Sequence, residues 1–127
     1  MQDNKLLMAQ DVDTPNKWTI PGGWCDIDLS PVETAIKEVK EETGYDIKVT
    51  KLLALIDRNK YTQSEIYNVY SIVFVGEIVG GENNPNFEVN EVGFFDLDDL
   101  PKLSNKVVKA ELDVILDAYK HDKIHFE

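Results

Sequence analysis

Apolar residues recur at helical spacing between residues 31 and 43. The stripe consists of Val32, Ala35, Ile36 and Val39. This spacing predicts an amphipathic helix with one face toward a core. Ser30 and Glu33 form a Ser-x-x-Glu capping box, and Pro31 suits the first helical position. Gly44 is placed to end the helix in a left-handed conformation, so both ends are defined by the sequence.

Alternating and β-branched apolar segments predict strands elsewhere in the chain. They cover residues 5–10, 18–20, 48–61 (a strand that runs into a loop), 68–79 and 91–97. Gly80 and Gly81 predict a loop. A second helix is expected to be capped by Ser104 and to carry a stripe of Val108, Leu112, Ile115 and Tyr119, and the terminus beyond it, with His125, is expected to fray. This order predicts a mixed sheet with helices on both faces.

The composition limits the function classes. The chain has 127 residues, 43% of them hydrophobic, which indicates one domain with a substantial core. No apolar run of about 18 residues occurs, so a membrane span is not expected. Cys25 is the only cysteine, which excludes an internal disulfide and favours a reduced, cytoplasmic setting. A net charge of −11 argues against general nucleic-acid binding, although divalent cations would let an acidic protein handle phosphates.

Three glutamates, Glu38, Glu41 and Glu42, lie near the C-terminal end of the predicted helix. They fall within an arc of roughly 100°, about a third of a turn from the apolar stripe. Like charges at i,i+4 cost ~0.2–0.5 kcal/mol, and the helix dipole adds ~0.3–1 kcal/mol for each exposed carboxylate. Lys37 and Lys40 offset part of this cost, so a solvated charged face is one interpretation. The other is a site for Mg²⁺, which prefers oxygen ligands and would assist attack of water on phosphorus.

The segment GGWCDIDLSPVETAIKEVKEETGY, residues 22–45, resembles the signature box of the Nudix hydrolases. That box reads G-x5-E-x7-R-E-U-x-E-E-x-G-U, where U is a bulky apolar residue. Seven of its nine defined positions match here, from Gly23 to Tyr45. The flanking WTIPGGW and DRNKY segments are also similar to the family, so the resemblance covers nearly the whole chain.

This resemblance implies an α+β fold, the α/β/α sandwich of the family with a mixed central sheet. Family members usually begin with one more strand, so residues 1–127 are expected to form a single Nudix domain without the usual N-terminal part. A sheet edge left unpaired in this way predicts a covering partner copy, and hence a homodimer. The resemblance also implies hydrolysis of a nucleoside diphosphate linked to another moiety, with Mg²⁺ or Mn²⁺ as cofactor.

Carried over position by position, the resemblance also assigns roles within the box. The implied metal ligands are Glu38, Glu41, Glu42 and the carbonyl of Gly22. The implied supporting residues are Gly23, Lys37 and Gly44. Two positions depart from the box: Leu29 replaces a glutamate, and Lys37 replaces an arginine that usually orients the glutamates. Lysine is a point charge rather than a planar fork, which predicts a looser hold on them.

The LIDRNK and GFFDLDDLP segments make the chain most similar to the CDP-choline pyrophosphatase and ADP-ribose pyrophosphatase-like group. The former tolerates a non-acidic residue at the position of Leu29. The implied products are a nucleoside monophosphate and a phosphorylated partner, which for CDP-choline are CMP and phosphocholine. A sensor that binds nucleotides without cleaving them is the alternative class. Loss of box glutamates is its usual mark, and three of the four remain here.

A general base must activate the attacking water. Glu41 and Glu42 are candidates within the box. Glu88 is a candidate outside it, in a place where relatives often carry a glutamate, and Glu82 and Glu91 are weaker ones. An exposed loop carboxylate is the alternative interpretation of Glu88.

Substrate binding is predicted for three further residues. Arg58, the only arginine in the chain, suits bidentate recognition of a phosphate, with Lys60 as its companion. A surface salt bridge is the alternative for Arg58. Trp24 is predicted to stack on a base, with packing against the sheet as the alternative.

Overall fold

The computed structural model describes residues 1, 4–13, 16–61 and 69–127. Its elements follow one another as β1 (Lys5–Asp11), β2 (Trp18–Thr19), α1 (Pro31–Thr43), β3 (Tyr45–Asp57), the 3₁₀ turn η1 (Arg58–Lys60), β4 (Tyr70–Gly81), β5 (Val89–Asp96), α2 (Lys109–Lys120) and β6 (His125–Phe126). The predicted α+β class and the predicted order of elements are confirmed, and β6 is an addition to them.

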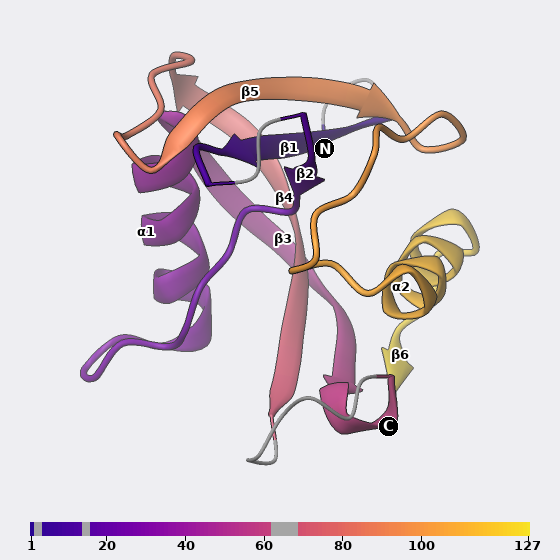
Figure 1. Cartoon of the computed structure of the whole chain (residues 1–127). Coiled ribbons are helices and arrows are strands. Elements are labelled where there is room, and N and C mark those ends of the chain that lie inside the picture. Colours follow the sequence, from indigo (N-terminus) through magenta and orange to yellow (C-terminus); the bar gives the residue numbers. More distant parts are fainter. Residues whose placement is uncertain (2–3, 14–15, 62–68) are drawn as a thin grey trace.

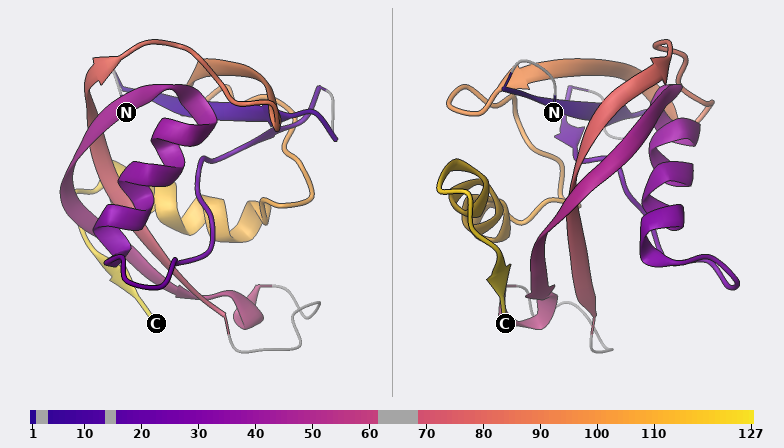
Figure 2. Two further views of the ribbon diagram at one scale, coloured as in Figure 1. Left: turned by 90° about the vertical axis from the view of Figure 1, so that its left-hand side faces the viewer. Right: turned by 180° about the vertical axis from the view of Figure 1, so that it is seen from behind.

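The described strands form two three-stranded sheets instead of one central sheet. The first has the order β2-β1-β5 and is antiparallel. The second has the order β4-β3-β6, in which β6 runs parallel to β3. Register shifts along the β3–β4 pairing mark bulges in this long hairpin. Figure 1 and Figure 2 show α1 and α2 on opposite sides of the hairpin, so the sandwich has the predicted helix on each face.

Two apolar clusters hold these layers together. The cluster between β3 and α2 contains Leu53, Ala54, Ile56, Ile115 and Ala118. The cluster between β1 and β5 contains Leu7, Ala9, Val89 and Val92. Val39 of α1 and Tyr45 pack against the second cluster, whereas Val32 is 38% exposed, so the predicted stripe is only partly buried. In the part of the chain that the structure describes, no helix is long and apolar enough to cross a membrane.

Both ends of α1 form as the sequence predicts. The hydroxyl of Ser30 accepts the N–H of Glu33 at 3.1 Å, and the carboxylate of Glu33 accepts the N–H of Ser30 at 3.0 Å. At the other end Gly44 has a φ of 86°, and its N–H donates to the carbonyl of Lys40 at 2.9 Å. Side chains disfavour this φ, which is why glycine ends the helix.

The β3–β4 hairpin is longer than predicted at the end that meets α1. Gly80 and Gly81 do not form a loop; they end β4 and pair with Asp46 and Tyr45, respectively. Correspondingly, β3 begins directly after Gly44, three residues earlier than expected. A glycine pair usually indicates a turn. Here the pairing with the start of β3, which is distant in sequence, outweighs that local preference. The strand that corresponds to β4 was predicted to begin at residue 68, which lies outside the described residues.

The C-terminal third of the chain also differs from the prediction. The helix α2 begins at Lys109, and Ser104 does not cap it. The hydroxyl of Ser104 instead accepts the N–H of Lys106 at 3.2 Å, within a turn. His125 does not fray but lies in β6 beside β3. Because this contact joins distant parts of the chain, no local pattern marks it.

Candidate functional site

Glu38 and Glu42 lie against the glycine turn that precedes α1. The Oε2 of Glu42 accepts the N–H of Gly22 at 3.0 Å. A Cβ on Gly23 would come within 2.8 Å of the Cδ of Glu38, so the absence of a side chain lets the backbone approach this carboxylate. The structure therefore brings two of the three predicted glutamate ligands to one short backbone segment.

Burial and like charge favour the protonated forms of both carboxylates. Desolvation raises the pKa of Glu42 to about 7, against the hydrogen bond from Gly22, which lowers it. The negative charges of Glu38 and Asp11 raise the pKa of Glu42 further. Desolvation also raises the pKa of Glu38, and the charge of Glu41 adds to this effect. Carboxylates perturbed in this way mark a candidate functional site, and a bound cation would stabilise their charged forms.

Glu41 has a different neighbour from the other two glutamates. It is exposed, and its Oε1 lies 3.6 Å from the Nζ of Lys37. The same amine lies closer, at 2.6 Å, to the Oδ2 of Asp26 in the segment before the helix. Hydrogen bonding to Asp26, and then the charges of Asp26 and Glu41, raise the pKa of Lys37. Lys37 thus divides its contacts between a box glutamate and an aspartate that the sequence reasoning did not identify.

The oxygen donors of this site suit a hard divalent cation such as Mg²⁺ or Mn²⁺. Among the described residues, no group of three Asp, Glu, His or Cys side chains is placed to hold an ion by itself. A cation held by Glu38 and Glu42 would therefore need further oxygens, from the backbone, water or substrate phosphates. Such mixed coordination is usual for Mg²⁺.

The loop between β4 and β5 brings Glu88 to the same region. The carbonyl of Glu88 accepts the N–H of Val12 at 3.1 Å, and its N–H donates to the Oδ1 of Asn86 at 3.1 Å. Its side chain is exposed, and its negative charge contributes to the raised pKa of Glu38. The backbone of Glu88 is therefore fixed while its carboxylate stays open to solvent near the box.

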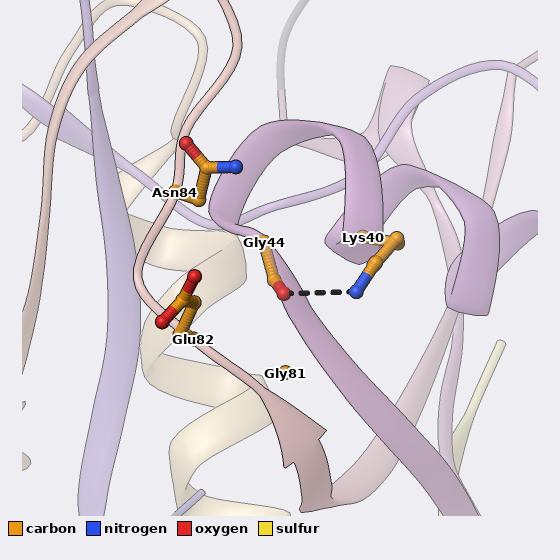
Figure 3. A pocket seen from close by; sticks show the side chains of 5 residues that line it. All are labelled: Lys40, Gly44, Gly81, Glu82 and Asn84. Atoms are coloured by element: carbon orange, nitrogen blue, oxygen red, sulfur yellow. Dashed lines mark hydrogen bonds between the residues drawn. The ribbon is translucent and has the colours of Figure 1, made fainter.

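A separate pocket lies at the C-terminal end of α1. It is lined by Lys40, Gly44, Gly81, Glu82 and Asn84 (Figure 3). The Nζ of Lys40 donates to the carbonyl of Gly44 at 3.2 Å in this pocket. None of the described lining residues is a box glutamate. The weaker base candidate Glu82 thus belongs to this pocket, and Glu91 is exposed on β5.

Trp24 and Leu29 lie in the segment between the glycine turn and the helix. Trp24 is 75% exposed, so it does not pack against the sheet and its ring is open for stacking on a base. Leu29 is partly buried, and its N–H donates to the carbonyl of Asp26 at 3.4 Å. Its side chain offers no oxygen to a cation.

Arg58 and Lys60 do not reach the glutamates. The Nε of Arg58 lies 3.4 Å from the Oε2 of Glu111 on α2, and the Nζ of Lys60 lies 3.4 Å from the Oε2 of Glu127. Figure 1 shows that the η1 turn follows β3 at the end beside β6, far from where α1 meets β3. The long strand separates the two regions. Arg58 does form a salt bridge, but a largely buried one rather than the surface salt bridge left as an alternative, and its binding of substrate stays a prediction.

Asp11 and Lys106 are charged neighbours of Glu42 that sequence reasoning missed. The Nζ of Lys106 forms an ion pair with the Oδ2 of Asp11. The charge of Asp11 raises the pKa of Glu42, and the charge of Lys106 lowers it. These two residues are 95 positions apart in the chain, so no local pattern connects them. The available signal was a carboxylate directly after the first predicted strand.

In metal-free protein, stability is expected to fall as the pH rises from about 4.5 to about 7. Glu42 has an ordinary pKa of 4.5 and a pKa of about 7 in the folded protein, so the folded state binds its proton more tightly. The stabilisation is complete below pH 4.5 and is lost as the pH passes 7. Its upper limit is about 3 kcal/mol, and partial exposure lowers it. Denaturant unfolding in EDTA at pH 5 and pH 8 measures the change, which Glu42→Gln should reduce.

Gly23→Ala is expected to weaken Mg²⁺ binding several-fold. The new Cβ would stand 2.8 Å from the Cδ of Glu38 and displace that carboxylate. Gly22→Ala is the matched comparison, because a Cβ there meets no described atom within 4 Å and the backbone groups are kept. Calorimetric titration of both variants with Mg²⁺ measures the difference. Equal affinities would contradict the assigned contact between Gly23 and Glu38.

Comparisons with known proteins agree on one family. The model of the NUDIX domain matches residues 1–116. The Bacillus subtilis protein YjhB, described provisionally as an ADP-ribose pyrophosphatase, is 34% identical over 122 residues. That match covers 94% of this chain and 58% of YjhB, so the chain spans little more than half of this relative.

Solved structures extend the agreement to the fold. The crystal structure of an ADP-ribose pyrophosphatase from Streptococcus suis matches with a TM-score of 0.83 and 36% identity, over 100% of this chain and 92% of that one. The crystal structure of a UDP-X diphosphatase matches with a TM-score of 0.88 and 29% identity, over 100% of this chain and 63% of that one. The family match over residues 1–116 and the shared fold lead to one conclusion: the chain belongs to the NUDIX domain family.

Proposed function

We propose that this protein hydrolyses the pyrophosphate bond of a nucleoside diphosphate linked to another moiety, with a divalent cation as cofactor. The observation that carries the proposal is the desolvated pair of Glu38 and Glu42 against the backbone of Gly22 and Gly23. ADP-ribose is the proposed substrate type, because the Streptococcus suis ADP-ribose pyrophosphatase is 36% identical and this chain covers 92% of it. CDP-choline, which Leu29 favours from the sequence, is the other candidate.

The proposed cation ligands are Glu38, Glu42, the carbonyl of Gly22 and, at the exposed side, Glu41. When bound, Mg²⁺ or Mn²⁺ would supply positive charge to the diphosphate and lower the pKa of a water. Gly23 and Gly44 support this arrangement, the first by admitting the carboxylate of Glu38 and the second by ending the helix. Lys37 restrains Glu41 from the outside.

Glu88 is the proposed general base. Its carboxylate is exposed, and its backbone is held by Val12 and Asn86, so it can accept the proton of an attacking water. Glu41 and Glu42 are the alternatives. The water oxygen forms a bond to one phosphorus, the bond from that phosphorus to the bridging oxygen breaks, and ADP-ribose yields AMP and ribose 5-phosphate. The exposed ring of Trp24 is proposed to stack on the base.

A substrate panel tests this proposal. ADP-ribose, CDP-choline and a UDP-linked sugar would each be incubated with Mg²⁺, with Mn²⁺ and with EDTA, and product release would be measured by chromatography. We expect cation-dependent cleavage, fastest for ADP-ribose. Tight binding of these nucleotides in EDTA, with no cleavage under any condition, would instead identify a sensor domain.

A cytoplasmic location and a homodimer are further parts of the proposal. The exposed, unpaired thiol of Cys25 is compatible with a reducing compartment. Within the described residues β4 has a neighbouring strand on one side, so its other edge could meet a second copy. Light scattering of the purified protein tests the dimer.

A further inference from the structure

We propose that Lys106 binds a phosphate group of the substrate beside Glu42, and that Asp11 positions its amine. This inference rests on the proposed function, because it adds a residue to the same site. The ligand class is the diphosphate portion of the substrate, which is common to every member of the panel.

The turn that carries Lys106 is anchored to the strand that leads to the glycine turn. Ser104 is buried, and its N–H donates to the carbonyl of Trp18 at 2.8 Å. The N–H of Trp18 in turn donates to the carbonyl of Lys102 at 2.8 Å. The hydroxyl of Ser104 then accepts the N–H of Lys106 at 3.2 Å. Two backbone hydrogen bonds thus fasten the turn that carries Lys106 to β2, and the chain after β2 continues to Gly22.

Asp11 holds the amine of Lys106 at one end of β1. Asp11 is the last residue of β1, where the pairing with β5 shifts register and Asp11 lies opposite Val89. The next residue, Val12, donates its N–H to the carbonyl of Glu88. The ion pair between Lys106 and Asp11 therefore holds the amine at the end of β1 that meets Glu88.

The two residues of this ion pair differ in exposure, which suits Asp11 to hold the amine and Lys106 to contact the ligand. The side chain of Asp11 is 15% exposed, whereas that of Lys106 is 64% exposed. A lysine ammonium has three donors, and Asp11 uses one face of it. The remaining donors are open to solvent, where they could meet a phosphate oxygen in a charge-assisted hydrogen bond.

The surrounding charges keep the amine ionised and close to the carboxylates. Hydrogen bonding to Asp11 raises the pKa of Lys106, and the charges of Asp13 and Glu42 add to the effect. The positive charge of Lys106 also lowers the pKa of Glu42. An anionic substrate entering this acidic site would meet a fixed positive charge there.

Other cations considered for the site pair with carboxylates. Arg58 and Lys60, which were predicted to bind substrate, pair with Glu111 and Glu127. Lys37, which was predicted to support the box, lies 2.6 Å from Asp26. Lys106 is the lysine that both adjoins Glu42 electrostatically and keeps an exposed head. This combination is what selects it.

Binding of inorganic pyrophosphate in the presence of Mg²⁺ tests the assignment without depending on turnover. Lys106→Gln is expected to raise its Kd about tenfold, and Lys106→Arg, which keeps the charge, about threefold or less. Lys109→Gln is the matched control, because Lys109 is similarly exposed but pairs with Asp113 at the start of α2. Its Kd should equal that of the unmodified protein. Calorimetry gives the Kd, and thermal unfolding confirms that each variant is folded.

Kinetics with ADP-ribose separate binding from chemistry. Lys106→Gln is expected to raise KM about tenfold with a smaller effect on kcat. Asp11→Asn should raise the Kd for pyrophosphate in the unmodified background and have no further effect in Lys106→Gln, because Asp11 acts through that amine. A purely structural role for Asp11 would produce the same change in both backgrounds, which would overturn its assignment as a positioning residue.

The result that overturns the assignment of Lys106 is an unchanged Kd for pyrophosphate in folded Lys106→Gln, or no binding by the unmodified protein. Failure of the proposed function gives a different pattern. In that case the unmodified protein cleaves no substrate of the panel, and the difference in pyrophosphate Kd between Lys106→Gln and Lys109→Gln still decides the role of Lys106.

Discussion

Glu42→Gln is expected to lower kcat at least tenfold without unfolding the protein. Glu42 is partly buried, is bonded to the N–H of Gly22 and has a pKa of about 7, so its charged form depends on a nearby cation. Glutamine keeps the shape of the side chain but removes one negative oxygen ligand. It also removes the desolvated charge, so stability at pH 8 is expected to be unchanged or higher.

Glu41→Gln is expected to lower kcat at least tenfold as well, but less than Glu42→Gln. Glu41 is more exposed and forms an ion pair with Lys37, so we expect it to contribute less to cation binding. Glu77→Gln is the control, because Glu77 is an exposed glutamate of β4 that pairs across the strand with Lys48. Steady-state rates at saturating Mg²⁺, together with thermal unfolding, measure these effects. Near-normal rates in both box variants would show that the cluster is a solvated face.

The helix that carries this cluster was predictable because its determinants are local. Ser30, Glu33 and Gly44 act within one turn of the helix ends, and the structure places each of them as predicted. The arc of glutamates follows from helix geometry alone. Helix geometry does not predict that the three glutamates differ in burial and in pKa. Glu42 is desolvated because the glycine turn folds against it, and that turn precedes it by 20 residues.

The residues that the sequence missed depend on contacts between distant segments. Asp11 meets Lys106 because β1 lies beside the turn before α2, and neither segment carries a pattern that refers to the other. Gly80 and Gly81 read as a turn, yet they extend β4 because Asp46 and Tyr45 are there to pair with them. Arg58 was assigned to phosphate on its chemistry, which is correct for arginine in general. Its place at the end of β3 also gives it an ion pair with Glu111, a partner that no local pattern identifies, and its role toward phosphate stays a prediction.

The candidate site is organised at the expense of stability in the absence of a cation. The burial of Glu42 and its repulsion by Glu38 and Asp11 all disfavour the charged form. A core that was optimised for stability would replace such a carboxylate with an apolar or neutral residue. Violations of folding rules of this kind are expected where function requires them. A bound cation, as proposed, would offset the mutual repulsion and the helix dipole that oppose the glutamates at this position.

Gly44→Ala is expected to lower the free energy of unfolding by at least about 2 kcal/mol. Its φ of 86° alone disfavours a side chain by roughly 1–2 kcal/mol. A Cβ would also stand 2.3 Å from the carbonyl oxygen of Glu82 and 2.6 Å from the N of Asn84, both of them backbone atoms. The junction between α1 and the β4–β5 loop would have to open, and this loop carries Glu88. We therefore expect a loss of kcat in addition to the loss of stability.

Gly80→Ala is the control for Gly44→Ala. It distinguishes the steric clash at Gly44 from a general effect of replacing a glycine near α1. Gly80 lies next to Gly81 in β4, and a Cβ there would meet its nearest atom, the Oδ2 of Asp46, at an ordinary 3.5 Å. Its expected change is within about 0.5 kcal/mol, as for an unstrained surface position. Guanidinium unfolding followed by circular dichroism measures both variants. A Gly44→Ala protein as stable as Gly80→Ala would mean that the helix end and the loop are not in the contact described.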